Sequence, residues 1–159
     1  MRQFFDLLSP KINFVCRRYF REEADINDAI QESFIRIFQN LHKYDSLKGD
    51  IFGWSYRVSV NECLRILRKN SKIEFDELDE SKVENITLEV SNDYESKEAM
   101  QLLDHLEGSQ RIIFNLFFVE GYSHKEIGEM LDMKEVTCRS IYHRAKSKLK
   151  HAYEKLYSL

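Results

Sequence analysis

The sequence is poor in the residues that make turns and loops. It has one proline, Pro10, and five glycines among 159 residues. A domain built from β-strands needs many turns, and turns use these two residue types, so an all-β fold is excluded. Neither a GxGxxG nor a Walker A sequence is present, which excludes the common glycine-rich phosphate-binding loops. These absences leave an all-α chain as the expected fold class.

Cysteines and long apolar runs are also scarce. The three cysteines, Cys16, Cys63 and Cys138, lie far apart without a CxxC pair or a histidine cluster, so we expect no metal and no cofactor, and three thiols in the core. The odd cysteine count and the lack of a signal peptide favour a reducing, cytoplasmic location. No apolar run reaches the ~20 residues of a membrane span. No nucleophile–base set or carboxylate pair stands out, so we expect no catalytic residues and no enzyme.

The net charge of −3 hides a strong segregation of charge. Residues 1–73 carry 13 basic and 9 acidic side chains, residues 74–98 carry 2 and 10, and residues 99–159 carry 9 and 8. Within the last block, residues 134–155 alone hold 7 basic and 2 acidic side chains. The acidic middle segment lacks a clean helical period. It therefore predicts a linker between two helical domains.

The first block predicts three or four helices. Pro10 sits where a helix can begin, and an apolar stripe follows it. The next helix is expected to start near the cap candidate Asn27. A turn with Gly49 then leads into a long helix over residues 51–69. The core stripe of the second helix is Ile30, Phe34, Ile37, Phe38 and Leu41.

The long helix has two faces. One face is an apolar stripe that runs from Phe52 to Leu67. A second stripe, offset by roughly 140°, is basic and has Trp54 at its start. The second stripe consists of Arg57, Asn61, Arg65 and Arg68. Two interpretations stay open here: a solvated basic face with a half-buried tryptophan, or a strip that follows phosphates and stacks bases.

The second block predicts four helices, of which the last two form a helix-turn-helix. Ser123 and Glu126 make a capping box for the first of the pair, and Gly128 suits a close crossing of the two helices. The last helix runs from about residue 135 to 157, with the core stripe Cys138, Tyr142, Ala145, Leu149 and Leu156. Its outward residues could reach base edges and phosphates, although simple helical hairpins share this pattern. They are Lys134, Glu135, Thr137, Arg139, Ser140, His143 and Arg144.

Two segments of the chain together resemble one known family. The first runs from DINDAIQESFIRIF to VNECLRILRK and is similar to region 2 of bacterial RNA polymerase sigma factors. The second runs from LEGSQRIIF to HRAKSKLK and is similar to region 4. Their order and the absence of a region 3 resemble the extracytoplasmic-function (ECF, group IV) class of the sigma-70 family. The resemblance implies two helical domains, at 1–73 and 99–159, joined by the acidic linker at 74–98.

The resemblance also implies a function. Such a protein binds core RNA polymerase at the β′ clamp helices and the β flap, recognises the minus-10 and minus-35 promoter elements, and helps to melt the DNA. An anti-sigma factor is a further partner that the class suggests. The acidic linker would thread through basic polymerase channels, or serve only as a solvated spacer. The main rival is a stand-alone helix-turn-helix regulator, and a helical interaction module or a metal-dependent enzyme is a weaker one.

The resemblance assigns roles position by position. The residues implied in core-polymerase binding are Asp28, Gln31, Glu32 and Phe34. Those implied in reading the minus-10 element are Asp45, Ser46, Lys48, Trp54, Arg57, Asn61, Arg65 and Arg68. The outward residues of the last helix, from Lys134 to Arg144, would read the minus-35 element.

Several positions depart from the family pattern, among them Ser55, where an apolar residue is usual, and Glu107, where a proline is common. Arg65 stands where an acidic residue is frequent, which adds positive charge to the promoter face. Asp132 replaces a usual turn glycine, and aspartate tolerates the left-handed conformation better than most residues. Ile141 falls near the outward face, where a polar residue is usual. It could contact a thymine methyl group or fold back onto the helix pair.

Overall fold

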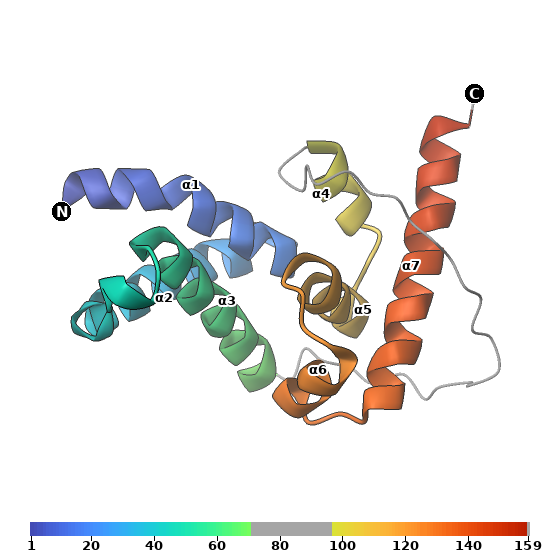
Figure 1. Ribbon diagram of the computed structural model, residues 1–159. Coiled ribbons are helices and arrows are strands. Elements are labelled where there is room, and N and C mark those ends of the chain that lie inside the picture. Colours follow the sequence, from blue (N-terminus) through green and yellow to red (C-terminus); the bar gives the residue numbers. More distant parts are fainter. Residues whose placement is uncertain (71–96, 159) are drawn as a thin grey trace. The chain divides into compact units, whose positions relative to one another are not determined.

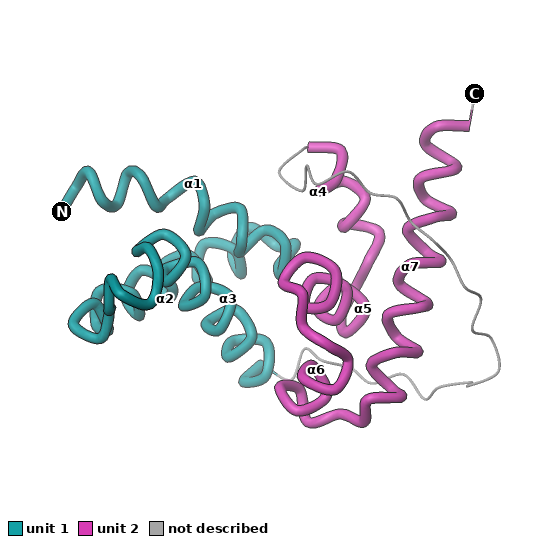
Figure 2. Tube along the Cα trace, in the orientation of Figure 1, with its two compact units in different colours: residues 1–72 teal, residues 73–159 magenta. Residues whose placement is uncertain are grey.

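The computed structural model describes residues 1–70 and 97–158. Within these ranges the chain consists of helices joined by short turns, without strands, which confirms the expected all-α class. The chain divides into two compact units, Met1–Lys72 and Ile73–Leu159 (Figure 2). The acidic linker that we expect at 74–98 lies, up to residue 96, outside the described residues. Each unit is considered by itself.

The first unit packs three helices around one apolar core (Figure 1). They are α1 (Arg2–Tyr19), α2 (Glu23–Asn40) and α3 (Ile51–Lys69). Two short 3-10 turns, Leu41–Lys43 and Ser46–Lys48, connect α2 to α3. Asp50 caps α3 by accepting a hydrogen bond from the Gly53 N–H at 2.8 Å. This cap fixes the start of the helix that the sequence predicts over residues 51–69.

The predicted starts of the first two helices are wrong. The α1 helix begins at Arg2, so Pro10 lies inside it. A proline within a helix removes one backbone hydrogen bond. The turns before Pro10 offset that loss by burying Leu8 in the core. The α2 helix begins at Glu23 rather than near Asn27, with acidic side chains in its first turn that suit the positive end of a helix.

The residues at the ends of the predicted apolar stripes are more exposed than the stripes suggest. Phe34 and Ile37 are buried as expected, whereas Phe38 and Leu41 are 37% and 38% exposed. Leu156, expected in the core of the last helix, is 57% exposed, because α7 continues past the last buried residue of its apolar stripe, Leu149. The spacing of apolar residues along a helix therefore predicts which face is buried. It does not predict how far along that face the neighbouring helix extends.

The described part of the second unit, residues 97–158, contains four α-helices. They are α4 (Lys97–Leu103), α5 (Gly108–Phe114), α6 (His124–Leu131) and α7 (Glu135–Tyr157), with a π-helical turn, Asn115–Val119, after α5. Arg111 is buried at the bend between α4 and α5, where it donates hydrogen bonds to the Leu103 carbonyl at 2.9 Å and to Asp104 at 3.1 Å. Among the helices described in either unit, none is both long enough and apolar enough to cross a membrane.

Candidate nucleic-acid interfaces

The helices α6 and α7 form the helix-turn-helix that the sequence predicts. Ser123 accepts from the Glu126 N–H at 3.1 Å, and Glu126 accepts from the Ser123 N–H at 2.7 Å, so the capping box is confirmed. Asp132 adopts the left-handed conformation, with φ of 54°, as expected for a turn position that usually holds glycine. These local features set where α6 begins and where it ends.

Gly128 allows the backbone of α6 to approach the turn. The Met133 N–H donates to the Gly128 carbonyl at 2.8 Å. A Cβ atom at position 128 would lie 2.6 Å from the Met133 carbonyl oxygen and 3.5 Å from the Glu135 nitrogen. Only a residue without a side chain fits so close to backbone atoms. The expected role of Gly128 at the crossing is therefore confirmed.

The predicted minus-35 residues lie along the first part of α7, beginning with its N-cap residue Lys134. Lys134, Glu135 and Arg139 are exposed there. Arg139 donates to the Glu135 carboxylate at 2.8 Å, which orients its guanidinium along the helix. The remaining predicted residues are half-buried along the same helix. They are Thr137, Ser140, His143 and Arg144.

The structure decides between the two interpretations of Ile141. Its side chain is 1% exposed, so it folds back into the core of the second unit and cannot contact a thymine methyl group. Val136 is the apolar residue that does face outward, at 53% exposure. It lies within the first turn of α7, between the exposed Glu135 and the half-buried Thr137. Sequence reasoning missed Val136 because an apolar residue is not usually assigned to a polar outward face. Its spacing of three residues from Arg139 and four from Ser140 is the signal that would have found it.

Two histidines of the second unit, His124 on α6 and His143 on α7, lie close to basic side chains of α7. The His124 ring stacks on Phe117, with centroids 4.1 Å apart, and contacts Tyr142 at 5.4 Å. Burial, followed by the charges of Arg139 and His143, lowers the pKa of His124. Burial, followed by Lys146 and Arg139, lowers the pKa of His143. Both imidazoles therefore lose their proton more readily than a histidine of the unfolded chain.

We expect the second unit to lose stability in mild acid. Because both histidine pKa values are lower in the folded state, the unfolded chain binds more protons below its own histidine pKa of about 6.5. The contribution of the two histidines to stability is then fully present well above that value and is lost as the pH falls through it, a change that measurements at about pH 7.5 and about pH 5.5 bracket. Amide hydrogen exchange of α6 and α7 at the two pH values measures the change. His124→Phe keeps a ring between Phe117 and Tyr142, and it should reduce the pH dependence. If the stability of this variant depends on pH as strongly as that of the wild-type chain, His124 is not the cause of the effect.

The predicted minus-10 strip lies on α3 and the turn before it. Arg57, Asn61 and Arg68 are exposed, and Trp54 is half-buried against Tyr44, with ring centroids 5.7 Å apart. Tyr44 also donates to the Gly49 carbonyl at 3.0 Å, which closes the turn, and its ring contact with Trp54 joins the turn to α3.

The turn itself presents exposed side chains. Asp45, Ser46 and Lys48 are all exposed there, as the predicted role requires. Asp45 accepts from the Leu47 N–H at 3.0 Å, and the Leu47 side chain is 93% exposed. Sequence reasoning missed Leu47 because a leucine is usually assigned to a core. Its position in a short capped turn is the signal that would have found it.

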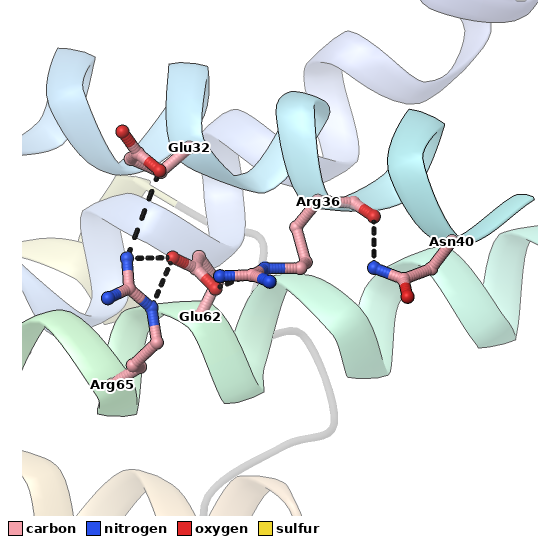
Figure 3. Close-up of polar contacts among 5 residues, drawn as sticks. All are labelled: Glu32, Arg36, Asn40, Glu62 and Arg65. Atoms are coloured by element: carbon pink, nitrogen blue, oxygen red, sulfur yellow. Dashed lines mark hydrogen bonds and ion pairs between the residues drawn. The ribbon is translucent and has the colours of Figure 1, made fainter.

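Arg65 belongs to an ion-pair network between α2 and α3 (Figure 3). Its Nε donates to Glu62 at 2.7 Å, and its Nη2 lies 3.8 Å from the Glu32 carboxylate. Glu62 is 3% exposed and also accepts from Arg36 at 3.3 Å. The Arg65 charge is therefore directed toward α2 rather than left unpaired beside Arg57 and Asn61.

The α2 residues implied in polymerase binding divide into two groups. Asp28 and Gln31 are exposed, and Glu32 is half-buried beside Arg65. Phe34 is buried and stacks on Phe5 with centroids 4.4 Å apart, so its ring packs inside the unit. In the parts of the chain that the structure describes, no three His, Cys, Asp or Glu side chains gather to hold a metal ion.

Two protein families match this chain, one for each unit. Residues 4–73 match the family described as Sigma-70 region 2, and residues 96–149 match the family described as Sigma-70, region 4. The first match covers α1 to α3 with the strip on α3, and the second covers the helix-turn-helix.

Several individual proteins are similar over most of this chain. The ECF RNA polymerase sigma factor SigE of Mycolicibacterium smegmatis is 32% identical over 135 residues, which cover 80% of this chain and 51% of that protein. The chain thus spans about half the length of this relative. SigM of Bacillus subtilis is 26% identical, covering 80% of this chain and 79% of SigM. The ECF sigma-E factor of Escherichia coli is 27% identical, covering 92% and 82%.

One solved structure shows the same fold. It is the sigma factor RpoE from Bartonella quintana, crystallised with the anti-sigma factor NepR. The TM-score is 0.53 with 16% sequence identity, and the match covers 96% of each chain. At this identity the likeness concerns the arrangement of helices alone.

Proposed function

This chain belongs to the ECF RNA polymerase sigma factors of the sigma-70 family, and from that membership we propose how its two units divide the work of promoter recognition. The second unit reads the minus-35 element, and the first binds core polymerase, reads the minus-10 element and helps to open the duplex. The observation that carries the proposal is the presence, in one chain, of a helix-turn-helix with a basic outward face and a region 2 unit with an exposed basic strip.

In the second unit, the start of α7 is the part that enters the major groove. Lys134 and Arg139 supply the positive charge and the hydrogen-bond donors that phosphates and guanine edges accept. Glu135 holds the Arg139 guanidinium at 2.8 Å and so reduces the entropy lost on binding. Val136 takes the place of Ile141 as the apolar contact for a thymine methyl group, because it is the exposed one.

In the first unit, the turn before α3 and the strip on α3 handle the melted minus-10 element. Extrusion of a base costs a few kcal/mol, which a pocket and aromatic stacking can return. Trp54 and Tyr44 supply aromatic surface, and the exposed Leu47 supplies an apolar contact for an unstacked base. Arg57 and Arg68 then follow the phosphates along the helix.

On α2, the carboxylates of Asp28 and Glu32 with the amide of Gln31 form the surface offered to core polymerase. Such a surface suits a basic coiled-coil partner like the β′ clamp helices. The β flap would bind the second unit. We further propose that an anti-sigma factor can bind this chain, as NepR binds the sigma factor RpoE in the Bartonella quintana complex. The chain would act in the cytoplasm, together with RNA polymerase.

The test is run-off transcription with purified core polymerase and a promoter library. We expect transcripts that start at discrete sites and depend on the added chain. Tight DNA binding by the chain alone, without any promoter-dependent transcript, would instead support the stand-alone regulator, which the region 2 match does not favour.

Matched variants test the assignment of α7. Arg139→Ala should reduce minus-35-dependent transcription by about 10-fold, since one good base contact contributes about 1–3 kcal/mol. Lys148→Ala removes the same charge from an exposed position farther along α7 and should change selectivity little. Core binding should be intact in both variants. Loss of core binding in Arg139→Ala would mean that this face of α7 contacts the polymerase instead of DNA.

A further inference from the structure

Two cysteines meet inside the first unit. Cys16 on α1 and Cys63 on α3 are fully buried, and their sulfur atoms lie 3.8 Å apart, with the Cys63 thiol donating to Cys16. Both are free thiols. The third cysteine, Cys138, is equally buried but lies in the second unit, on α7. Only the first two are close to each other across a helix contact.

The surroundings of the pair favour a thiolate on one sulfur. The hydrogen bond from Cys63 lowers the pKa of Cys16, and the Ser33 hydroxyl and the Arg18 charge act in the same direction against the effect of burial. Accordingly the hydrogen bond to Cys16, followed by burial, raises the pKa of Cys63. Arg18 is itself fully buried, so its charge acts through a medium of low polarity. A cation beside a thiol raises the fraction of thiolate, which is the reactive form. Because both sulfurs are buried, the oxidant has to reach them through a local opening of the contact between α1 and α3.

We propose that Cys16 and Cys63 form a reversible oxidation site, at which a peroxide converts the two thiols into a disulfide that ties α1 to α3. Thiols of a reducing compartment stay reduced until an oxidant appears, and disulfides formed there are usually transient and redox-sensing. The inference concerns the first unit alone and does not depend on how the chain recognises promoters.

The chemistry balances with hydrogen peroxide as oxidant. The Cys16 thiolate attacks one peroxide oxygen, an S–O bond forms, the O–O bond breaks, and hydroxide leaves as water after taking a proton. Cys63 then loses its proton and attacks the sulfenic sulfur, so that the S–S bond forms, the S–O bond breaks and a second water leaves. Two electrons pass from the sulfurs to the peroxide. The sulfurs must close from 3.8 Å to a bond of about 2.05 Å.

The disulfide would close a loop that contains all of α2 and the turn before α3. Cross-linking a loop of this size restricts the unfolded chain. For a unit of this size we expect the melting temperature to rise by roughly 10–25 °C. Dithiothreitol should return it to the starting value.

The test treats the full folded chain with hydrogen peroxide, blocks remaining thiols with N-ethylmaleimide after denaturation, and maps the peptides by mass spectrometry. We expect a Cys16–Cys63 disulfide that reductant reverses, with Cys138 fully alkylated as the internal control. Cys138→Ala should form the same cross-link, whereas Cys16→Ala and Cys63→Ala should form none. Circular dichroism checks that each variant is folded.

Two results would overturn the proposal. One is full alkylation of Cys16 and Cys63 under oxidant doses that already oxidise Cys138. The other is a Cys16–Cys63 disulfide that forms only when the chain is unfolded before treatment, because the native contact would then not be its cause. Both readouts come from the wild-type chain, so a variant that fails to fold leaves them intact.

Discussion

Gly128→Ala is expected to destabilise the second unit by about 2 kcal/mol and to abolish minus-35-dependent transcription. The added Cβ would lie 2.6 Å from the Met133 carbonyl oxygen, a distance that real Cβ contacts essentially never show. The obstacle is backbone rather than a flexible side chain, so the turn itself must move. Alanine favours the helix over glycine by about 1 kcal/mol. The expected loss of unfolding free energy is therefore the cost of the clash minus this gain.

The displaced turn carries the start of α7, and for this reason the effect extends to DNA binding. Lys134 and Glu135 follow Met133 directly, so a shift there moves the first residues of the proposed reading surface. Amide hydrogen exchange of α6 and α7 reports this unit separately from the first one. Glu129→Ala is the matched control, because it adds no atom and lies exposed on the same helix. A Gly128→Ala chain as stable as this control would show that the turn can open without cost.

Local signals in the sequence were sufficient for some helix ends. The α3 helix and the capping box of α6 depend on contacts between residues two to four positions apart, as between Asp50 and Gly53 or Ser123 and Glu126. Side chains so close along the chain meet whenever the helix forms. Predictions of this kind therefore need no knowledge of the rest of the unit.

Other helix ends depend on distant partners. The turns of α1 before Pro10 form because Leu8 is buried in the core and Phe5 stacks on Phe34 of α2. Periodicity along one helix does not show how far its neighbour extends. The same limit explains why Phe38 and Leu156 are more exposed than their stripes suggest.

The candidate interfaces also combine features that local spacing predicts with features that depend on distant partners. The positions of Arg57, Asn61 and Arg139 on outward faces follow from helical spacing. The pairing of Arg65 with Glu62, three residues earlier on α3, also follows from that spacing, whereas its pairing with Glu32 does not, because Glu32 lies on α2. Val136 and Ile141 are five residues apart and therefore lie about 140° apart around α7. Ile141 is buried because α7 packs on both α5 and α6, which covers a wider face of the helix than its apolar stripe predicts.

Arg18→Ala is expected to destabilise the first unit strongly, because it removes a fully buried side chain at the contact between α1 and α3. Arg18 is 0% exposed, donates to the Tyr56 hydroxyl of α3, and lies over the rings of Phe14, Tyr19 and Tyr56 at 5.3 to 5.9 Å. Truncation removes these contacts and leaves a cavity at the α1–α3 contact. We expect a loss of about 3 kcal/mol or more. Thermal unfolding followed by hydrogen exchange of α1 and α3 measures it.

The neighbouring residue supplies the control. Arg17 is 41% exposed and pairs with Glu23 at 2.8 Å, so Arg17→Ala removes the same side chain from the surface and should shift the melting temperature little. Arg18→Met then separates volume from charge, because methionine fills much of the same space without a cation. A buried ion can often be replaced by an apolar side chain of similar volume at little cost. We therefore expect Arg18→Met to retain most of the stability that Arg18→Ala loses. If the methionine variant is as unstable as the alanine variant, the guanidinium and its bond to Tyr56, rather than the packing, hold α1 against α3.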